Sequence, residues 1–294
     1  MVYIKLWING GIEMKTQTVL ITGTSSGFGL LSAYQLAKAG YKVIASMRNL
    51  EKKSALLRML EKDKLKERVV FVELDVTSQR SIDELTTLLH NTNGIDILIN
   101  NAGFAFGGFS EEIHIDEYKE QFETNVFGVM RVTQAVLPFM REKRKGKIIN
   151  ISSISGLIGF PGLSPYVSSK HALEGYSESL RLELKPFGVD VALIEPGSYA
   201  TNIWTTGKKV SKHSLNEGSA YRAYMRAIEN ELQAGEKKLG DPDQVVSLLL
   251  SLCNQRQLKK LRYPVGKGVK VSVWLKRMLP WSVWERIIIK KLLK

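Results

Sequence analysis

Two side chains able to move a proton stand four residues apart in the stretch YVSSK, namely Tyr166 and Lys170. On a helix this spacing places both side chains on one face. A phenol has an unperturbed pKa of about 10, and a nearby ammonium group favours its ionised form. Such a pair can donate and accept protons near neutral pH. Tyrosine and lysine also meet at helical spacing by chance, so the rest of the chain must supply a reaction for them.

A glycine-rich turn follows the first apolar run of the chain. The stretch ITGTSSGFG contains Gly23, Gly27 and Gly29 and leads into a segment with helical periodicity. Glycines in a turn from strand to helix let the backbone approach a pyrophosphate, whose charge the helix N-terminus stabilises. Such a turn can also serve only close packing of helix on sheet. Its place between the first strand and the first helix favours dinucleotide binding.

The end of the second apolar run, VIASMRN, bears on the type of cofactor. An acid there would bond the free 2′-hydroxyl of NAD, but no Asp or Glu occurs before Glu51. Arg48 suits a 2′-phosphate instead, which favours NADP(H) over NAD(H). The alternative is a solvated arginine. Asp75, after the third run, can accept a hydrogen bond from the adenine amino group or cap the next helix.

Short β-branched runs alternate with helical patterns from residue 17 onward. This alternation predicts the α/β class, with a single doubly wound parallel sheet (a Rossmann fold) and helices on both faces. We expect one domain over residues 16–264, with a less regular segment at about 198–240 and a basic tail over 265–294. Residues 1–15 are expected to be an extension, with Met1 or Met14 as the start. The predicted strands are 18–22, 42–46, 69–74, 95–100, 147–152 and 189–195.

The composition is ordinary for a globular protein, with 44% hydrophobic and 24% charged residues among 294. Cys253 is the single cysteine, which excludes an internal disulfide and fits a reducing compartment, so we expect a cytoplasmic protein. The four histidines lie far apart without ligand spacing, which predicts no metal site. The sequence has no run of 18 apolar residues, so it predicts no membrane-spanning helix.

The net charge of +13 is concentrated near the C-terminus, because residues 256–294 hold twelve Lys or Arg and one acid. A nucleic-acid-binding protein would place such charge on its folded domain, so we expect no nucleic-acid partner. Beyond Pro280 the apolar residues fall on a helical stripe. A basic amphipathic helix can lie on an anionic membrane surface, cap the pocket or dock on another subunit. The residues of this stripe are Trp281, Trp284, Ile287, Ile288 and Leu292.

Seven short motifs occur in a fixed order, and together they resemble those of the short-chain dehydrogenase/reductase family over residues 16 to about 260. The SGFG of the glycine turn and the long C-terminal extension are most similar to the hydroxysteroid and retinol dehydrogenase-like branch. The motifs are TGTSSGFG (22–29), LDVT (74–77), NNAG (100–103), Asn125 in ETNVFG, Ser153 in ISSISG, YVSSK (166–170) and EPG (195–197).

The resemblance implies roles for four residues. Tyr166 would be the general acid and base, and Lys170 would lower its pKa and bond the nicotinamide ribose. Ser153, thirteen residues before Tyr166, would hold the substrate oxygen, with Ser152 and Ser155 as nearby competitors. Asn125 would hold a water that relays protons to Lys170; its alternative role is to bond neighbouring backbone groups in a helix.

The resemblance also implies the two binding sites. The substrate site would be apolar, formed by Ser153, Phe104, Phe160, Tyr199 and Trp204, with Phe106 and Pro161 nearby, under a mobile lid at about 198–240. Such a site would favour an apolar alcohol or ketone. The cofactor site would comprise Gly23, Thr24, Ser25, Ser26, Gly27, Phe28, Gly29, Arg48, Asp75, Val76, Asn101, Ala102, Gly103, Tyr166, Lys170, Pro196, Gly197 and Thr201.

We therefore expect an NADP-dependent carbonyl reductase or alcohol dehydrogenase that acts on an apolar substrate as a homodimer or homotetramer. A sensor or scaffold that binds NADP(H) without turnover is the alternative from another class, since a fold does not fix a function. A third reading is epimerisation, in which one site oxidises and then reduces the same substrate.

Overall fold

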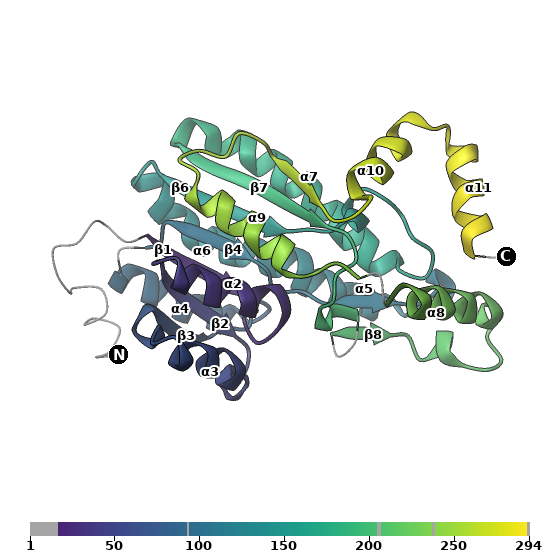
Figure 1. Ribbon diagram of the computed structural model, residues 1–294, viewed down its shortest axis with the longest axis horizontal. Helices are drawn as coiled ribbons and strands as arrows, with labels where there is room; N and C mark the ends of the chain where they lie inside the picture. The colour runs from purple at the N-terminus through teal and green to yellow at the C-terminus, as the bar shows by residue number, and fades with distance from the viewer. Residues whose placement is uncertain (1–16, 93, 205–206, 237–238, 293–294) are drawn as a thin grey trace.

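A sheet of seven parallel strands forms the centre of the molecule (Figure 1). The structure is a computed structural model that describes residues 17–92, 94–204, 207–236 and 239–292. The strand order is β3-β2-β1-β4-β6-β7-β9, which confirms the doubly wound α/β fold. The strands are β1 (Thr18–Thr22), β2 (Lys42–Met47), β3 (Val69–Glu73), β4 (Ile97–Asn100), β6 (Gly146–Ile151), β7 (Val189–Pro196) and β9 (Arg262–Val265).

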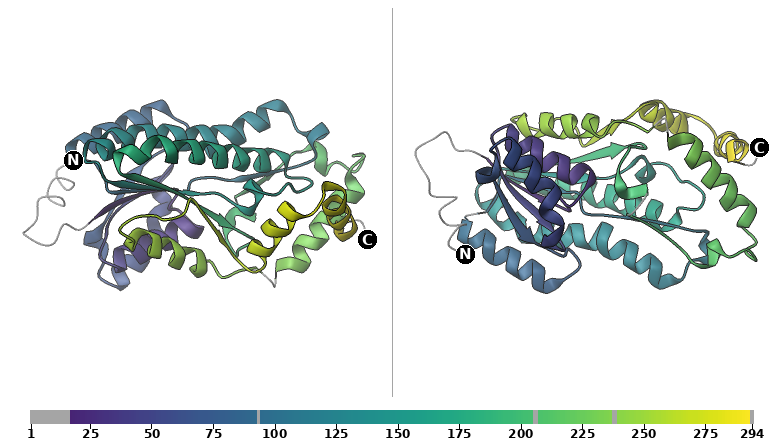
Figure 2. Two further views of the ribbon diagram at one scale, coloured as in Figure 1. Left: turned by 90° about the horizontal axis from the view of Figure 1, so that it is seen from above. Right: turned by 60° about the horizontal axis from the view of Figure 1, so that its bottom comes forward.

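Helices cover both faces of this sheet (Figure 2). One face packs against α2 (Gly27–Lys38), α3 (Ser54–Lys62) and α9 (Asp243–Asn254), through residues such as Leu36, Leu60 and Leu249. The other packs against α4 (Gln79–Thr92), α6 (Gly128–Glu142) and α7 (Ser164–Leu184), through residues such as Leu85 and Val136. The central strands β4, β6 and β7 are buried along their whole length, which explains their continuous apolar runs.

The order of the strands reverses between β1 and β4, because β2 and β3 extend the sheet on one side and β6, β7 and β9 extend it on the other. At such a switch point the loops that follow neighbouring strands diverge to opposite faces, and a crevice opens beyond the carboxyl ends. The glycine turn follows β1 and the NNAG stretch follows β4. The topology therefore places both motifs at the edges of one crevice.

Several elements were not predicted from the sequence. Strand β9 pairs with β7 at the sheet edge, and a small second sheet joins β5 (Ala105–Gly107) to β8 (Lys208–Val210). These strands have three or four residues each and lack long apolar runs, so their sequences carry a weak strand signal. The helices α5 (Ile115–Phe122), α8 (Arg222–Glu236), α10 (Val269–Met278) and α11 (Trp281–Leu292) complete the fold.

The tail consists of α10 and α11, which lie at the end of the molecule away from β2 and β3, where α11 packs against α8 (Figure 1). The predicted helix beyond Pro280 is present, but its apolar stripe is divided. Trp284 is buried and Ile288 is half-buried, whereas Trp281 and Ile287 are exposed. The side chain of Leu292 lies outside the described residues. Among the helices that the structure describes, none is long and apolar enough to cross a membrane.

Candidate active site

A cleft of about 600 Å³ lies beyond the carboxyl ends of β1, β2, β3, β4, β6 and β7. The glycine turn lines one wall, and Tyr166 and Lys170 of α7 line another. The structure thereby brings together most of the residues expected to bind a cofactor. Those that line the cleft are Gly23, Ser25, Ser26, Gly27, Phe28, Arg48, Asp75, Val76, Asn101, Ala102, Gly103, Tyr166, Lys170, Pro196, Gly197 and Thr201.

Two residues of the glycine turn, Thr24 and Gly29, are not among the lining residues. The Thr24 hydroxyl is buried and donates to the Ser46 carbonyl oxygen at 3.1 Å. A Cβ atom at Gly29 would lie only 2.3 Å from the Gly23 carbonyl oxygen and 2.4 Å from the Asn101 amide nitrogen. These residues shape the turn from behind, and at Gly29 only glycine fits without displacement.

Asn101 connects the glycine turn to the loop after β4. Its amide nitrogen donates to the Gly23 carbonyl oxygen at 2.9 Å, and Gly23 itself has a φ of +73°. That backbone conformation favours glycine. A Cβ atom at Gly23 would also lie 2.8 Å from the Cα atom of Ala102. The two loops thus fix each other, and the resulting backbone cradle at the N-terminus of α2 suits a pyrophosphate.

The far end of the cleft carries two cations, Arg48 and Lys52. Lys52 was not predicted, although it lies only four residues after Arg48 and no strand separates the two. Asp75 is also a lining residue, and its Oδ1 atom accepts bonds from the backbone nitrogen and the hydroxyl of Thr77, at 2.9 and 2.7 Å. These bonds form a local turn that ends before α4, where the Ser78 hydroxyl oxygen accepts from the Ser81 backbone nitrogen at 3.4 Å, so Asp75 does not take the capping role considered for it. The excess of positive charge at this end suits a phosphate group.

Tyr166 and Lys170 lie on the same face of α7, as their spacing requires. Lys170 donates to the Ile151 carbonyl oxygen at 2.8 Å, and its nitrogen is 5.7 Å from the centre of the Tyr166 ring. Burial lowers the pKa of Lys170 to about 8, and the nearby charge of Glu174 opposes this shift. The ammonium group is therefore anchored at the strand end while its charge is only marginally stable near neutral pH.

The pKa of Tyr166 shifts in the direction opposite to the prediction. Burial raises it to about 12, and the hydrogen bond with Ser153 opposes the rise. Tyr166 is 3% exposed, and its environment disfavours a phenolate more strongly than spacing along a helix could indicate. In this structure the hydroxyl is protonated at neutral pH.

Ser153 is favoured over its two neighbours by its position. It lines the cleft, bonds Tyr166, and accepts a bond from the Ser155 backbone nitrogen at 3.1 Å. Ser155 is buried and is not a lining residue. Ser152 lines the cleft, but its hydroxyl has no hydrogen-bond partner among the residues described. Only Ser153 of the three therefore combines exposure to the cleft with a bond to the tyrosine.

Asn125 is buried in a π-helical turn, Glu123–Phe127, between α5 and α6. Its side chain bonds both the backbone nitrogen and the carbonyl oxygen of Phe104, at 3.2 and 3.1 Å. Its amide nitrogen also donates to the Ser169 hydroxyl at 3.3 Å. The side chain thus bridges the loop after β4 to α7; it bonds backbone groups, but those of a distant loop and not neighbouring groups in its own helix. Turns of the π type recur at functional sites.

The residues expected to bind substrate are only partly brought together. Phe104 and Tyr199 line the cleft. Phe160 is half-buried and is not among the lining residues, because the loop that carries it lies outside the described cleft. The side chain of Trp204 lies outside the described residues. Sequence reasoning missed several other lining residues: Leu74 and Thr124 lie within recognised motifs but were not assigned to the site, and Met47, Asn49, Asn202, Ile203 and Gly207 lie outside those motifs.

No group of three His, Cys, Asp or Glu side chains in the described part of the chain is arranged to hold a metal ion. The side chains at the cleft suit proton transfer and phosphate binding instead. Tyr166 bonds the Ser153 hydroxyl, and Lys170 donates to the Ile151 carbonyl oxygen. A hydroxyl group can both accept a proton and donate one to a substrate oxygen.

Comparison with known proteins agrees with the fold and the motifs. A profile of the short chain dehydrogenase family matches residues 17–212. An uncharacterized oxidoreductase of Bacillus subtilis is 47% identical over 279 residues, which cover 95% of this chain and 99% of that protein. A 3-ketodihydrosphingosine reductase of Bacteroides thetaiotaomicron is 38% identical over 77% of this chain and 82% of its own length.

Two further similarities bear on the branch and the cofactor. Retinol dehydrogenase 8 of Homo sapiens is 39% identical over 68% of this chain and 64% of its own length. The crystal structure of a variant actinorhodin polyketide ketoreductase with NADPH has a TM-score of 0.72 and 29% identity, covering 86% of this chain and 97% of that one. The chain belongs to the short-chain dehydrogenase/reductase family, as the sequence motifs indicated.

Proposed function

We propose that this protein transfers a hydride between NADP(H) and an apolar ketone, aldehyde or secondary alcohol. The observation that carries the proposal is the meeting of Ser153, Tyr166 and Lys170 in the same cleft as the glycine turn. A protein that only sensed or displayed NADP(H) would need the turn but not a hydroxyl pair beside a buried lysine. The alternative of a sensor without turnover is therefore less well supported.

The chemistry assigned to the side chains is proton transfer. When bound, the nicotinamide supplies the hydride. The Tyr166 hydroxyl donates its proton to the carbonyl oxygen as the carbonyl carbon accepts the hydride, so that a C–H and an O–H bond form and the C=O π bond is lost. The Ser153 hydroxyl holds the same oxygen. Burial raises the pKa of Tyr166 further above its ordinary value, which keeps the hydroxyl in the form that can donate this proton.

The preference for NADP(H) rests on Arg48 and Lys52. Both lie at the end of the cleft where the adenosine ribose would be placed by the glycine turn, and a guanidinium group bonds phosphate oxygens well. The NADPH-bound ketoreductase of similar fold supports this choice. Asp75 would remain available to the adenine only through its second oxygen, since Oδ1 already accepts two bonds from Thr77.

The apolar substrate is inferred from the walls of the cleft and from relatives. Phe104 and Ile203 contribute apolar side chains to the lining of the cleft, and Tyr199, which also lines it, is largely buried against Phe28. Two relatives carry names that refer to 3-ketodihydrosphingosine and to retinol. We infer a long or bulky apolar carbonyl compound as the substrate class.

We assign residues at about 198–240 to a lid over this substrate. Asn202, Ile203 and Gly207 line the cleft, so this segment already closes one side of it. Its helical part is attached to the body through Tyr221, whose ring stacks on Phe109 with centroids 4.5 Å apart. Closure of such a segment would exclude water from the hydride acceptor.

Replacement of Tyr166 by Phe tests the proposed reaction. The variant should bind NADPH like the parent and reduce apolar ketones and aldehydes about 100-fold or more slowly, because only the transferable proton is removed. Absorbance of the reduced nicotinamide measures turnover, and nicotinamide fluorescence measures binding. Parental turnover in this variant would refute the assignment, and tight NADPH binding without turnover on any carbonyl by the parent would favour the sensor.

We further propose that α10 and α11 contact an anionic membrane surface, which would give the cleft access to a lipophilic substrate. Seven of the thirteen exposed large apolar side chains in the described part of the chain lie between residues 271 and 289. Val271, Trp274 and Met278 form an exposed stripe at helical spacing along α10. Of the cations beside it, Lys270 is exposed, and Arg277 is exposed although its charge also acts on Glu195. Exposed apolar and exposed basic groups together suit anionic lipid.

Vesicle sedimentation tests this contact. The parent should sediment with vesicles that contain phosphatidylglycerol, less so at high salt, and weakly with phosphatidylcholine alone. The double variant Trp274→Ser/Met278→Ser should lose sedimentation, whereas Leu182→Ser, at a 73% exposed position on α7, should keep it. Equal binding by both variants, or a change of oligomeric state without a change in vesicle binding, would overturn the proposal in favour of a subunit contact.

The expected cytoplasmic homodimer or homotetramer remains a proposal that follows from family membership and the low cysteine content. Light scattering during gel filtration of the full chain would determine the oligomeric state. A monomer at micromolar concentration would contradict the expectation.

A further inference from the structure

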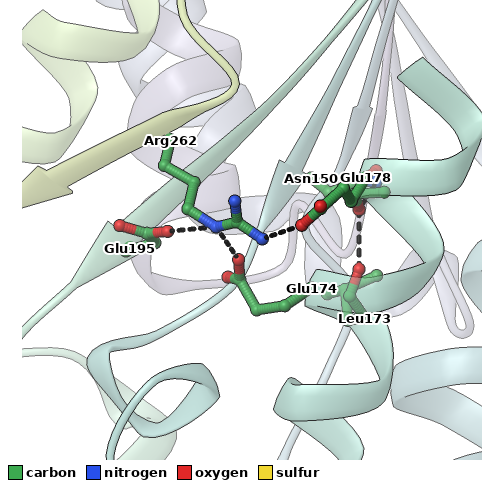
Figure 3. Close-up of polar contacts among 7 residues, drawn as sticks. Asn150, Leu173, Glu174, Glu178, Glu195 and Arg262 are labelled. Carbon is green, nitrogen blue, oxygen red and sulfur yellow. Dashed lines mark hydrogen bonds and ion pairs between the residues drawn. The ribbon is translucent and has the colours of Figure 1, made fainter. Parts of the chain in front are cut away.

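A cluster of four charged side chains lies between α7, the helix that carries Tyr166 and Lys170, and the strands β7 and β9 (Figure 3). Arg262 of β9 is at its centre. Its Nε atom is 2.9 Å from Glu174 Oε2 and 3.6 Å from Glu195 Oε1, and its Nη2 atom is 2.8 Å from Glu178 Oε2. Glu174 and Glu178 come from α7, and Glu195 comes from β7. Three carboxyl groups therefore share one guanidinium group.

The two inner carboxyl groups are buried, and their charge is incompletely compensated. Glu195 is 1% exposed and Glu174 is 4% exposed. Both oxygens of Glu195 and Oε1 of Glu174 lack a hydrogen-bond partner among the described residues. Two buried carboxylates near each other repel, and unbonded buried oxygens are costly. One proton held between them would remove a charge and supply a hydrogen bond.

Burial and the neighbouring carboxyl group favour retention of this proton, whereas the nearby cations oppose it. Burial and the neighbouring Glu174 raise the pKa of Glu195 to about 8, against the influence of Arg262 and, from α10, Arg277. The groups that face the pair from each packed element are Lys170 and Glu178 of α7, Arg262 of β9, Arg277 of α10 and the hydroxyl of Ser152 after β6.

The cluster adjoins the active site on two sides. Glu174 follows Lys170 by one helical turn, and it is the charge that opposes the loss of the Lys170 proton. Glu195 immediately precedes Pro196 and Gly197, which line the cleft. Gly156 allows the close approach, because a Cβ atom there would lie 2.9 Å from Glu174 Cγ and 2.9 Å from the Ser152 hydroxyl oxygen.

We propose that Glu174 and Glu195 share one proton at neutral pH, and that Glu174 is a positioning residue that keeps Lys170 charged. The inference rests on the proposed function, because it assigns a role relative to Lys170. Glu195 in its neutral form lets Glu174 remain ionised without a second buried charge beside it. Glu174 then stabilises the ammonium group, which the proposed reaction needs next to Tyr166.

Removal of the Glu174 charge should therefore affect the pH dependence of the reaction. With Glu174→Gln, burial of Lys170 is no longer opposed, so its proton is lost at lower pH. The alkaline limb of the kcat/KM profile should move toward acid by about one pH unit. Glu174→Asp retains the charge and should restore most of the profile. Glu178→Gln, which changes the exposed ligand of the same arginine, is the matched control and should leave the profile in place.

Infrared difference spectroscopy of the full-length protein tests the shared proton independently of turnover. The parent should show a protonated carboxyl band at pH 7 that disappears as the pH rises past about 8. The band should be lost in Glu195→Gln and persist in Glu178→Gln and Tyr166→Phe. Circular dichroism of each variant confirms that it is folded.

The outcomes separate this inference from the proposed function. Absence of a protonated carboxyl band in the parent at pH 7 would overturn the shared proton. An unmoved kcat/KM profile in folded Glu174→Gln, or the same movement in Glu178→Gln, would overturn the positioning role. Parental activity in Tyr166→Phe would refute the reaction itself while leaving the infrared result intact.

Discussion

A methyl group added at Gly29 gives a sharp test of how the cofactor cradle is built. The new Cβ atom would lie 2.3 Å from the Gly23 carbonyl oxygen and 2.4 Å from the Asn101 amide nitrogen, whereas ordinary contact begins at 3.4 Å. The turn after β1 and the loop after β4 must therefore separate from α2 by about 1 Å. Overpacking of this size costs roughly 1–3 kcal/mol. Because both displaced groups belong to the cleft wall, folding and NADPH binding should weaken together.

The expected values follow from these magnitudes. Gly29→Ala should lower Tm by about 2–12 °C, since 1 kcal/mol corresponds to about 2–4 °C for chains of 150–250 residues. The Kd for NADPH should rise about tenfold, which corresponds to about 1.4 kcal/mol. Thermal unfolding followed by circular dichroism gives the first quantity, and titration by nicotinamide fluorescence gives the second.

Gly175→Ala is the matched control, because Gly175 lies within α7 and a Cβ atom there meets nothing within 4 Å. Alanine in a helix interior is favoured over glycine by about 1 kcal/mol, so this variant should keep or slightly raise Tm. If Gly29→Ala matched the parent in both Tm and NADPH affinity, the close packing of the turn against α2 would not be needed for the cradle.

Two further predictions concern charge. Arg48→Asp should weaken NADPH binding about tenfold or more while NADH binding changes little, because the 2′-phosphate loses a charge-assisted bond and meets a like charge; titrations with both nucleotides would reveal equal effects if the reasoning fails. Glu195→Gln should alter the pH dependence of stability: the pKa of Glu195 is raised from 4.5 to about 8 on folding, so its contribution is present below pH 4.5 and is lost as the pH rises to about 8. The Tm of the parent relative to this variant should fall across that interval, and a constant difference from pH 5 to 8 would contradict the buried neutral carboxyl.

Much of the fold could be predicted because its signals are local. The strands β1, β2, β6 and β7 lie where β-branched apolar runs occur, since a strand buried on both faces of a parallel sheet needs an apolar side chain at each position. Strand β9 could not be found in this way. Its four residues include Arg262 and Pro264, and it exists because β7 offers an unpaired edge.

The residues of the candidate site likewise fall into those with a local sequence signal and those without one. The glycine turn, Arg48 and the pair Tyr166 and Lys170 each occupy a short stretch whose chemistry can be inferred from spacing alone. Lys52 was missed because a lysine in a charged helix has no distinguishing signal. Phe160 was placed in the pocket by resemblance, and its loop proved to lie outside the described cleft.

Residue types and their order determined the fold class and pointed to the glycine turn and the candidate pair Tyr166 and Lys170, because each depends on neighbours within a few positions. Only the tertiary structure decided the electrostatics. It buried Tyr166 deeply enough to raise its pKa, and it brought Glu174 to Arg262 across 88 residues of sequence. Desolvation and charge proximity depend on what packs around a group in three dimensions, and spacing along the chain does not contain that information.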